Sequence, residues 1–103
     1  MNYSTIKVEK KEGYVILTMD RPGDMNSLSR PMVAELMDSL TQIESDESVK
    51  AVVLTGGNYI FCAGMDLKEM SVLPDGDIDE YFSSMADFLK MVYSCMNLHS
   101  HLI

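Results

Sequence analysis

Hydrophobic and polar residues alternate at the start of the chain and then give way to longer apolar runs. Residues 5–9 alternate apolar and polar side chains, and residues 14–19 form a run that is apolar on both faces. The segment 10–13, Lys-Lys-Glu-Gly, lies between them and has the composition of a turn. This pattern predicts two strands joined as a hairpin, which feeds a covered sheet.

A segment whose apolar residues recur at helical spacing follows the second strand. Residues 21–24, Arg-Pro-Gly-Asp, end the strand because proline removes a ladder donor and glycine permits a turn. Ser29 is then placed as the N-cap of a helix that tolerates Pro31 in its first turn. Segment 45–48 ends this helix. Its apolar positions form one stripe, made of Met32, Val33, Leu36, Met37, Leu40 and Ile43.

Residues 49–55 form a continuous apolar run of strand length. Such a run is typical of a parallel strand in a sheet that is covered on both sides. A strand, a helix and a returning strand imply a βαβ crossover. The pattern therefore predicts an α/β fold.

The second half of the chain predicts two further helices. The first runs from Asp66 to about Val72, and residues 74–76 form a loop. Asp77 and Glu80 have the spacing of a capping box for the second helix. Its apolar positions recur at helical spacing and are Ile78, Tyr81, Phe82, Met85, Phe88, Leu89 and Val92. Residues 97–103 show no pattern, and His99 and His101 are assigned to a solvated tail, so no metal site is expected.

Length and charge narrow the possible functions. At 103 residues, the chain is expected to hold one domain. A net charge of −8 argues against nucleic acid or an anionic membrane as a partner, because both attract basic surfaces. No apolar run approaches the roughly 20 residues that cross a bilayer, and residues 1–5 do not resemble a secretory signal. A cytoplasmic location is therefore expected.

The segment 61–70, Phe-Cys-Ala-Gly-Met-Asp-Leu-Lys-Glu-Met, is the richest in chemical information. It follows the apolar strand and a Gly-Gly-Asn turn at 56–58, and it leads into a helix. A strand end, small residues and a helix start leave backbone N–H groups free for a ligand. Such groups suit an oxygen atom that gains negative charge during a reaction.

These ten residues resemble the oxyanion loop of the enoyl-CoA hydratase/isomerase (crotonase) superfamily. Residues 20–29 and 51–56 resemble two other segments of that family, in the same order. The resemblance covers most of positions 3–95. It implies a ββα-spiral core of the crotonase type. Because family members are much longer, residues 1–103 are expected to be a truncated, N-terminal portion of that domain.

The resemblance also implies a function and a set of site residues. Family members bind an acyl-CoA thioester, as in fatty acid metabolism, and stabilise its enolate with two backbone N–H groups. One of these donors would be the amide of Met65. The residues expected to contact substrate are Met25, Ser27, Leu28, Ala63, Gly64, Asp66, Leu67 and Lys68.

Several of these roles have a structural alternative. Asp66 could act as the N-cap of the following helix. Lys68 could meet a CoA phosphate, or it could be an exposed lysine paired with a neighbour. Asn26 is expected to fix its turn through its side chain. Met25, Met65 and Met70 could also line an acyl pocket, because methionine adapts to irregular spaces.

The chain departs from the family pattern in its later part. The second oxyanion donor and the acid/base glutamates of the family lie beyond the matched region, and nothing assigns their roles to Glu69 or Glu80. Hydratase, other lyase and isomerase chemistry are therefore not distinguished. No cofactor besides the acyl-CoA substrate is expected, and the resemblance implies a trimer-based homo-oligomer.

Two alternatives remain open. The chain could be a non-catalytic, truncated crotonase-like fragment. It could also be a small nucleotide-binding α/β module, although segment 56–58 carries neither a GxGxxG sequence nor a P-loop lysine.

Overall fold

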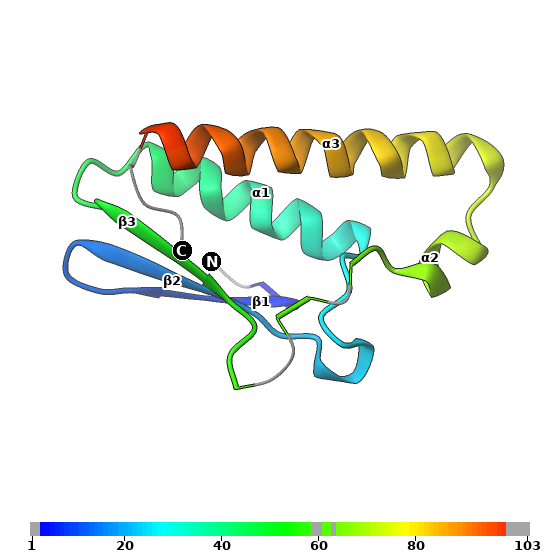
Figure 1. Ribbon diagram of the computed structural model, residues 1–103, viewed down its shortest axis with the longest axis horizontal. Coiled ribbons are helices and arrows are strands. Elements are labelled where there is room, and N and C mark those ends of the chain that lie inside the picture. Colours follow the sequence, from blue (N-terminus) through cyan, green and yellow to red (C-terminus); the bar gives the residue numbers. More distant parts are fainter. Residues whose placement is uncertain (1–2, 59–60, 63, 99–103) are drawn as a thin grey trace.

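The computed structural model describes residues 3–58, 61–62 and 64–98. Two α-helices lie on one face of a small sheet, with α1 between the sheet and α3 (Figure 1). In chain order the elements are β1 (Ile6–Lys10), β2 (Tyr14–Met19), the short 3₁₀ helix η1 (Pro22–Asp24), α1 (Arg30–Glu44), β3 (Ala51–Thr55), α2 (Leu67–Ser71) and α3 (Asp75–Leu98).

The sheet has the order β1-β2-β3. β1 and β2 form the predicted antiparallel hairpin, in which Val8 lies opposite Leu17. β3 returns through α1 and pairs in parallel with β2, so that Ala51 lies opposite Tyr14. The predicted βαβ crossover is therefore confirmed. It places the C-terminal ends of β2 and β3 side by side at one end of the sheet.

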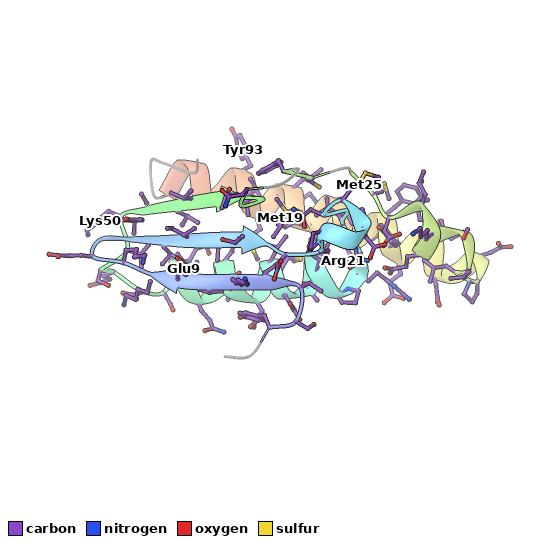
Figure 2. All side chains as sticks on the ribbon, turned by 90° about the horizontal axis from the view of Figure 1, so that it is seen from below. Glu9, Met19, Arg21, Met25, Lys50 and Tyr93 are labelled. Atoms are coloured by element: carbon purple, nitrogen blue, oxygen red, sulfur yellow. The ribbon has the colours of Figure 1, made fainter. Side chains whose placement is uncertain are left out.

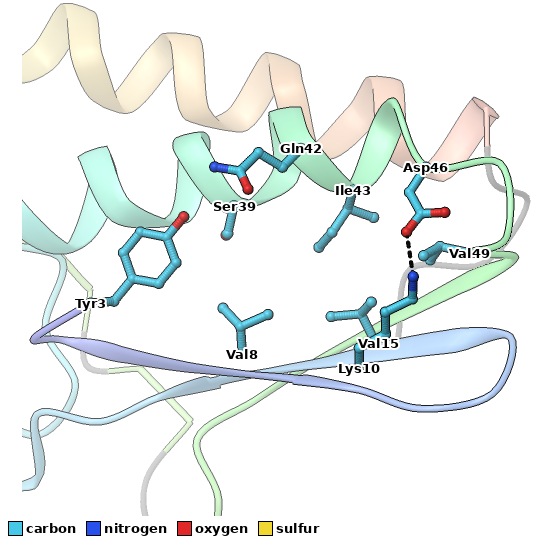
Figure 3. Close-up of a pocket in the computed structure, with 9 residues that line it drawn as sticks. All are labelled: Tyr3, Val8, Lys10, Val15, Ser39, Gln42, Ile43, Asp46 and Val49. Atoms are coloured by element: carbon cyan, nitrogen blue, oxygen red, sulfur yellow. Dashed lines mark hydrogen bonds and ion pairs between the residues drawn. The ribbon is translucent and has the colours of Figure 1, made fainter. Parts of the chain in front are cut away.

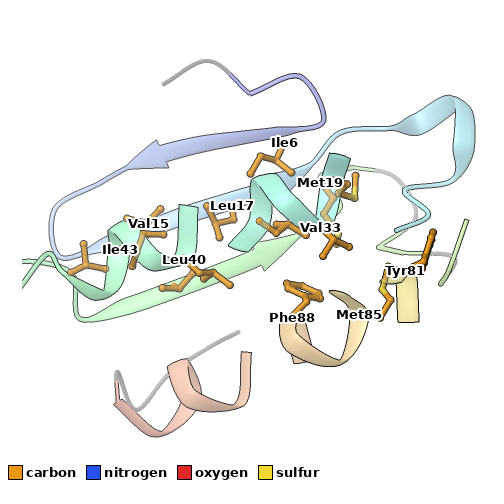
Figure 4. Packing of buried hydrophobic residues seen from close by; sticks show 14 residues of the cluster. Ile6, Val15, Leu17, Met19, Val33, Leu40, Ile43, Tyr81, Met85 and Phe88 are labelled. Atoms are coloured by element: carbon orange, nitrogen blue, oxygen red, sulfur yellow. The ribbon is translucent and has the colours of Figure 1, made fainter. Parts of the chain in front are cut away.

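The core lies between the inner face of the sheet and α1, and it continues between α1 and α3 (Figure 4). Alternate residues of β2, namely Val15, Leu17 and Met19, are buried because period-two alternation points them all at α1. Most of the predicted α1 stripe is buried with them, and Met37 is half-buried at its margin. Ser29 caps α1 as expected, with its hydroxyl accepting a hydrogen bond from the Met32 amide at 3.3 Å.

The expectation of a sheet covered on both faces is wrong for the described residues. α3 packs against α1 and leaves the outer face of the sheet uncovered. Tyr14 is exposed on that face, while Ile16 and Val53 are only half-buried. The apolar runs of β2 and β3 therefore present a second hydrophobic surface, and nothing in residues 3–58, 61–62 and 64–98 packs on it.

Two expectations for α3 also need correction. The helix begins at Asp75, so residues 75 and 76 are helical and Asp77 lies in the first turn, where it is no capping-box residue. The Pro74 carbonyl accepts hydrogen bonds from the Asp77 and Ile78 amides and starts the helix two residues early. Phe82 and Leu89 are exposed, because the helix buries only the narrow face that carries Tyr81, Met85 and Phe88.

Within the described ranges, no helix combines the length and the apolar character that a membrane span requires.

Candidate functional site

Two loops that are distant in sequence meet beside the ends of β2 and β3. Leu28 and Met65 form a single parallel β-bridge. The Leu28 amide donates to the Gly64 carbonyl at 2.6 Å, and the Asp66 amide donates to the Leu28 carbonyl at 3.4 Å. The structure thus joins the loop after η1 to the loop before α2, as the site requires.

This bridge fixes the direction of the Met65 amide. In an extended segment, successive backbone groups point to opposite sides. Because the Gly64 carbonyl and the Asp66 amide both point toward Leu28, the N–H of Met65 points away from it. No described residue accepts a hydrogen bond from this N–H. The amide named from the sequence is therefore available as a donor on the open side of the bridge.

Arg21 holds the two loops together through its guanidinium. Its Nη1 donates to the Ser27 carbonyl at 2.7 Å, while Nη2 lies 3.0 Å from Asp24 and 3.1 Å from Asp66. The guanidinium is largely buried, and it links η1, the loop after it and the N-cap of α2. The sequence reasoning used Arg21 only to end a strand. A planar group with five donors, next to a turn rich in acceptors, was the signal available for this role.

The turn after η1 has a left-handed backbone. Met25 and Asn26 have φ values of 54° and 53°, a region that residues other than glycine seldom occupy. The buried Asn26 Oδ1 accepts a hydrogen bond from the Arg21 amide at 2.6 Å, which confirms the expected turn-fixing role. Met25 is 51% exposed, and it lies with Arg21 beside η1 at the end of β2 (Figure 2).

Asp66 is the N-cap of α2, with its carboxylate accepting from the Glu69 amide at 3.1 Å. Burial by itself would raise the pKa of this carboxyl group. The hydrogen bond from the Glu69 amide and the ion pair with Arg21 outweigh burial, so the pKa of Asp66 is lowered. Of the two roles left open, the structure therefore shows the capping role.

Tyr81 is a site residue that the sequence reasoning placed only in an apolar stripe. Its side chain is fully buried, and its hydroxyl donates to the Leu28 carbonyl and accepts from the Asp66 amide at 3.0 Å. Burial raises the pKa of this phenol, so the hydroxyl keeps its proton as a donor. Tyrosine rather than phenylalanine on a buried helix face was the signal, because a buried hydroxyl needs partners.

A hollow of about 270 Å³ opens beside these loops. It is lined by Gly23, Asp24, Met25, Ser27, Met65, Asp66, Leu67 and Lys68. Most of the residues expected to bind substrate therefore share one surface depression. Leu28 and Gly64 lie next to it in the β-bridge, while Ala63 lies outside the described residues.

Two of these residues have features that bear on ligand approach. Gly64 has a φ of +100°, and a Cβ built at this position would meet nothing within 4 Å. Space is therefore open beside the backbone there, and the conformation favours glycine. The Lys68 side chain is 84% exposed, with its Nζ 3.5 Å from Asp24. Lys68 is thus the exposed, paired lysine of one alternative, and it stands at the rim of the hollow.

Of the two glutamates considered from the sequence, Glu69 already has a partner. Glu69 accepts from both the amide and the side chain of Arg30, with its carboxylate 2.7 Å from Nε. Glu80 is an exposed residue of α3. In the described part of the chain, no group of three or more His, Cys, Asp or Glu side chains is arranged to hold a metal ion, and His99 and His101 lie outside that part.

The hairpin, the βαβ unit and the bridged loops define an α/β chain of the crotonase type. A family model described as enoyl-CoA hydratase/isomerase matches residues 9–98. The chain belongs to the enoyl-CoA hydratase/isomerase family.

Similar proteins support this assignment. The chain is 38% identical over 87 residues to 4-chlorobenzoyl coenzyme A dehalogenase-2 from Arthrobacter sp, a match that covers 84% of this chain and 32% of that protein. It is 36% identical over 88 residues to 1,2-epoxyphenylacetyl-CoA isomerase from Escherichia coli, with 85% and 33% covered. The crystal structure of enoyl-CoA hydratase from Bacillus anthracis superposes with a TM-score of 0.81 at 33% identity, over 86% of this chain and 35% of that one. The chain therefore spans about a third of the length of these relatives.

Proposed function

We propose that this chain binds an acyl-CoA thioester in the hollow between the loop after η1 and the start of α2. The observation that carries the proposal is the Met65 amide, which points away from Leu28 on a bridge between the two loops that line the hollow. A backbone donor held in this way suits the thioester oxygen, which becomes more negative as an enolate forms. Loss of one such donor typically costs about 2.7–4 kcal/mol of transition-state stabilisation.

The names of the relatives share CoA but differ in the reaction, so they support thioester binding more strongly than any one reaction. Proteins named as a dehalogenase, an isomerase and a hydratase match at similar identity. The first two names include a CoA thioester, and the third names an enoyl-CoA reaction. The shared portion therefore suits what these proteins have in common, and we assign it to thioester binding and enolate stabilisation of the hydratase/isomerase type. Fatty acyl chains are the proposed substrates, in the cytoplasm.

Charge at the rim supports a phosphate contact. Lys68 is held by Asp24 at 3.5 Å, but Asp24 also has Arg21 at 3.0 Å. A CoA phosphate could therefore take Lys68 without leaving Asp24 unpaired. Because Lys68 is exposed, its contribution should be modest and screened by salt.

Calorimetric titration with crotonyl-CoA tests the proposal. Gly64→Val should abolish binding, since a branched side chain would fill the open space beside the backbone and strain a φ of +100°. Gly13→Val is the matched control, because Gly13 also has positive φ and open surroundings but lies in the β1–β2 turn. This control variant should bind as the wild type does.

Lys68→Ala should weaken binding a few-fold and reduce its salt dependence, whereas Lys50→Ala, at the far end of the sheet, should do neither (Figure 2). Equal affinity of Gly64→Val and the wild type would show that this loop is not the site. Absence of binding by the wild-type chain would reject the proposal itself.

A further inference from the structure

The outer edge of β1 has backbone groups without partners among the described residues. The sheet order places β1 at one edge, paired only with β2. The Asp20 amide donates to the Thr5 carbonyl and the Lys11 amide to the Tyr14 carbonyl, both at 2.8 Å, so Thr5 and Lys11 direct their backbone groups at the β2 side. Because an antiparallel ladder alternates, the N–H and C=O groups of Ile6, Val8 and Lys10 point outward.

The side chains of β1 include the charged residues Lys7, Glu9 and Lys10, which discourage pairing with most other strands. Its residues after Ile6 are all exposed, and no proline, glycine or bulge interrupts the strand. The unpaired backbone groups of an edge strand are still a template for a second strand, provided that the charges of that strand complement those of β1. Lys7 and Glu9 carry opposite charges on the outer face of the strand. A second strand is therefore favoured when it places an acidic residue opposite Lys7 and a basic residue opposite Glu9.

We propose that two copies of this chain associate through β1, with the strands antiparallel about a two-fold axis at Val8. In this arrangement Val8 lies opposite Val8 of the second copy, and Ile6 lies opposite its Lys10. All the outward-pointing backbone groups of β1 then find partners. Lys7 of each copy faces Glu9 of the other in a pair without backbone hydrogen bonds, where cross-strand side chains are closest.

The same charges exclude the neighbouring registers. The ladder admits only shifts that keep outward-pointing residues opposite one another. A shift in one direction places Lys7 opposite Lys7 of the second copy, and a shift in the other places Glu9 opposite Glu9. Like charges directly opposite are destabilising. The sequence Ile-Lys-Val-Glu-Lys at 6–10 therefore selects the register centred on Val8.

A hollow beside β1 favours the same contact. About 300 Å³ of space lies between β1 and α1, with Val8, Val15, Ile43 and Val49 among its walls (Figure 3). Val8 points to it from the strand edge and is 42% exposed. In the proposed dimer, Val8 of the second copy lies beside this residue and covers the open apolar wall. The contact is separate from the loops of the thioester site and does not depend on the proposed function.

Sedimentation equilibrium over a concentration series tests the proposal through a charge exchange. The wild-type chain should dimerise. Lys7→Glu and Glu9→Lys should each weaken the dimer at least tenfold, because each places like charges opposite one another. The double variant Lys7→Glu/Glu9→Lys should restore association. An equimolar mixture of the two single variants should form a mixed dimer, which native mass spectrometry identifies when one variant is uniformly labelled with nitrogen-15, because lysine and glutamate have nearly the same mass.

Val8→Pro provides a second test that spares the fold. Its N–H points outward, so proline removes no bond to β2, and edge strands tolerate proline. Circular dichroism should match the wild type while the dimer is lost. Tyr14→Ser, on the uncovered outer face of the sheet, should leave the dimer intact. A monomeric wild type, or dimers that persist unchanged in Lys7→Glu and Val8→Pro, would overturn the proposal.

Discussion

At the scale of single residues, one ion pair connects the stability of the site to pH. Asp66 is buried, caps α2 and lies 3.1 Å from Arg21. The lowered pKa of Asp66 means that the folded state binds its proton less readily than the unfolded chain does. Its stabilising effect is therefore complete above the ordinary carboxyl pKa of about 3.9, and it is lost as pH falls through the depressed value.

We predict that Asp66→Asn lowers the free energy of unfolding at pH 7 by about 1.5–3 kcal/mol, in the range of hydrogen bonds to charged groups. The variant should also lose less stability than the wild type when pH falls below about 4. Glu35, whose pKa is lowered because hydrogen bonds from Thr5 and Ser4 outweigh burial, keeps part of the acid dependence in both proteins.

Urea titrations followed by circular dichroism from pH 2 to pH 7 would measure both effects. Asp87→Asn is the control, since Asp87 is exposed on α3 and forms no ion pair with a described residue. An acid dependence in Asp66→Asn equal to that of the wild type would contradict the prediction.

At the scale of elements, α3 supports the site as well as the core. The helix packs on α1, and through the Tyr81 hydroxyl it reaches both Leu28 and Asp66. A single side chain of α3 thus ties together the two loops that form the β-bridge.

We predict that Tyr81→Phe lowers the free energy of unfolding by about 1–3 kcal/mol, because a buried carbonyl loses a donor and a buried amide loses an acceptor. Tyr93→Phe on the same helix should change it by less than about 0.5 kcal/mol, since Tyr93 is 67% exposed. Thermal and urea unfolding would compare the two variants. Similar losses in both would show that the Tyr81 hydroxyl does not support the loops.

Elements of the fold were predictable from local pattern, whereas the contacts between loops were not. The strand at 14–19 and the Ser29 cap followed from apolar alternation and capping chemistry, which act within a few residues. The bonds of Arg21 to Asp66 and of Tyr81 to Leu28 join residues far apart in sequence, and no periodicity encodes them. Of the site, the Met65 loop came from a family resemblance, while its supporting residues became visible only in three dimensions.

At the scale of the whole molecule, the chain carries about a third of the length of its relatives, and its described residues leave one sheet face open. Among the described residues, the carboxylates that line the hollow are Asp24 and Asp66. Both are held by Arg21, which disfavours their use as bases. Hydration of an enoyl thioester gains typically 10²–10⁴-fold from a positioned acid or base.

We therefore predict that the 103-residue chain has no measurable crotonyl-CoA hydration. The loss of the enoyl thioester absorbance measures turnover, with a full-length hydratase of this family as the positive control. Robust turnover by the chain would contradict the prediction and point to Glu69 or Glu80 as the carboxylate. Turnover that survives Asp24→Asn and stops in Glu69→Gln would make it Glu69, despite its contact with Arg30.

The parallel pairing of β2 with β3 also sets an order of assembly. The β1–β2 hairpin closes over a short turn, and α1 forms from local contacts, but Ala51 reaches Tyr14 only after the whole intervening helix has been brought into place. Closing such a long loop costs chain entropy before its contacts form, and pairings of this kind are slow. Leu28 lies within the loop that this pairing closes, and Met65 lies after β3, so their bridge also joins residues that are far apart in sequence. We therefore expect the bridge that aims the Met65 amide to be completed late in folding, after the hairpin and α1 have formed.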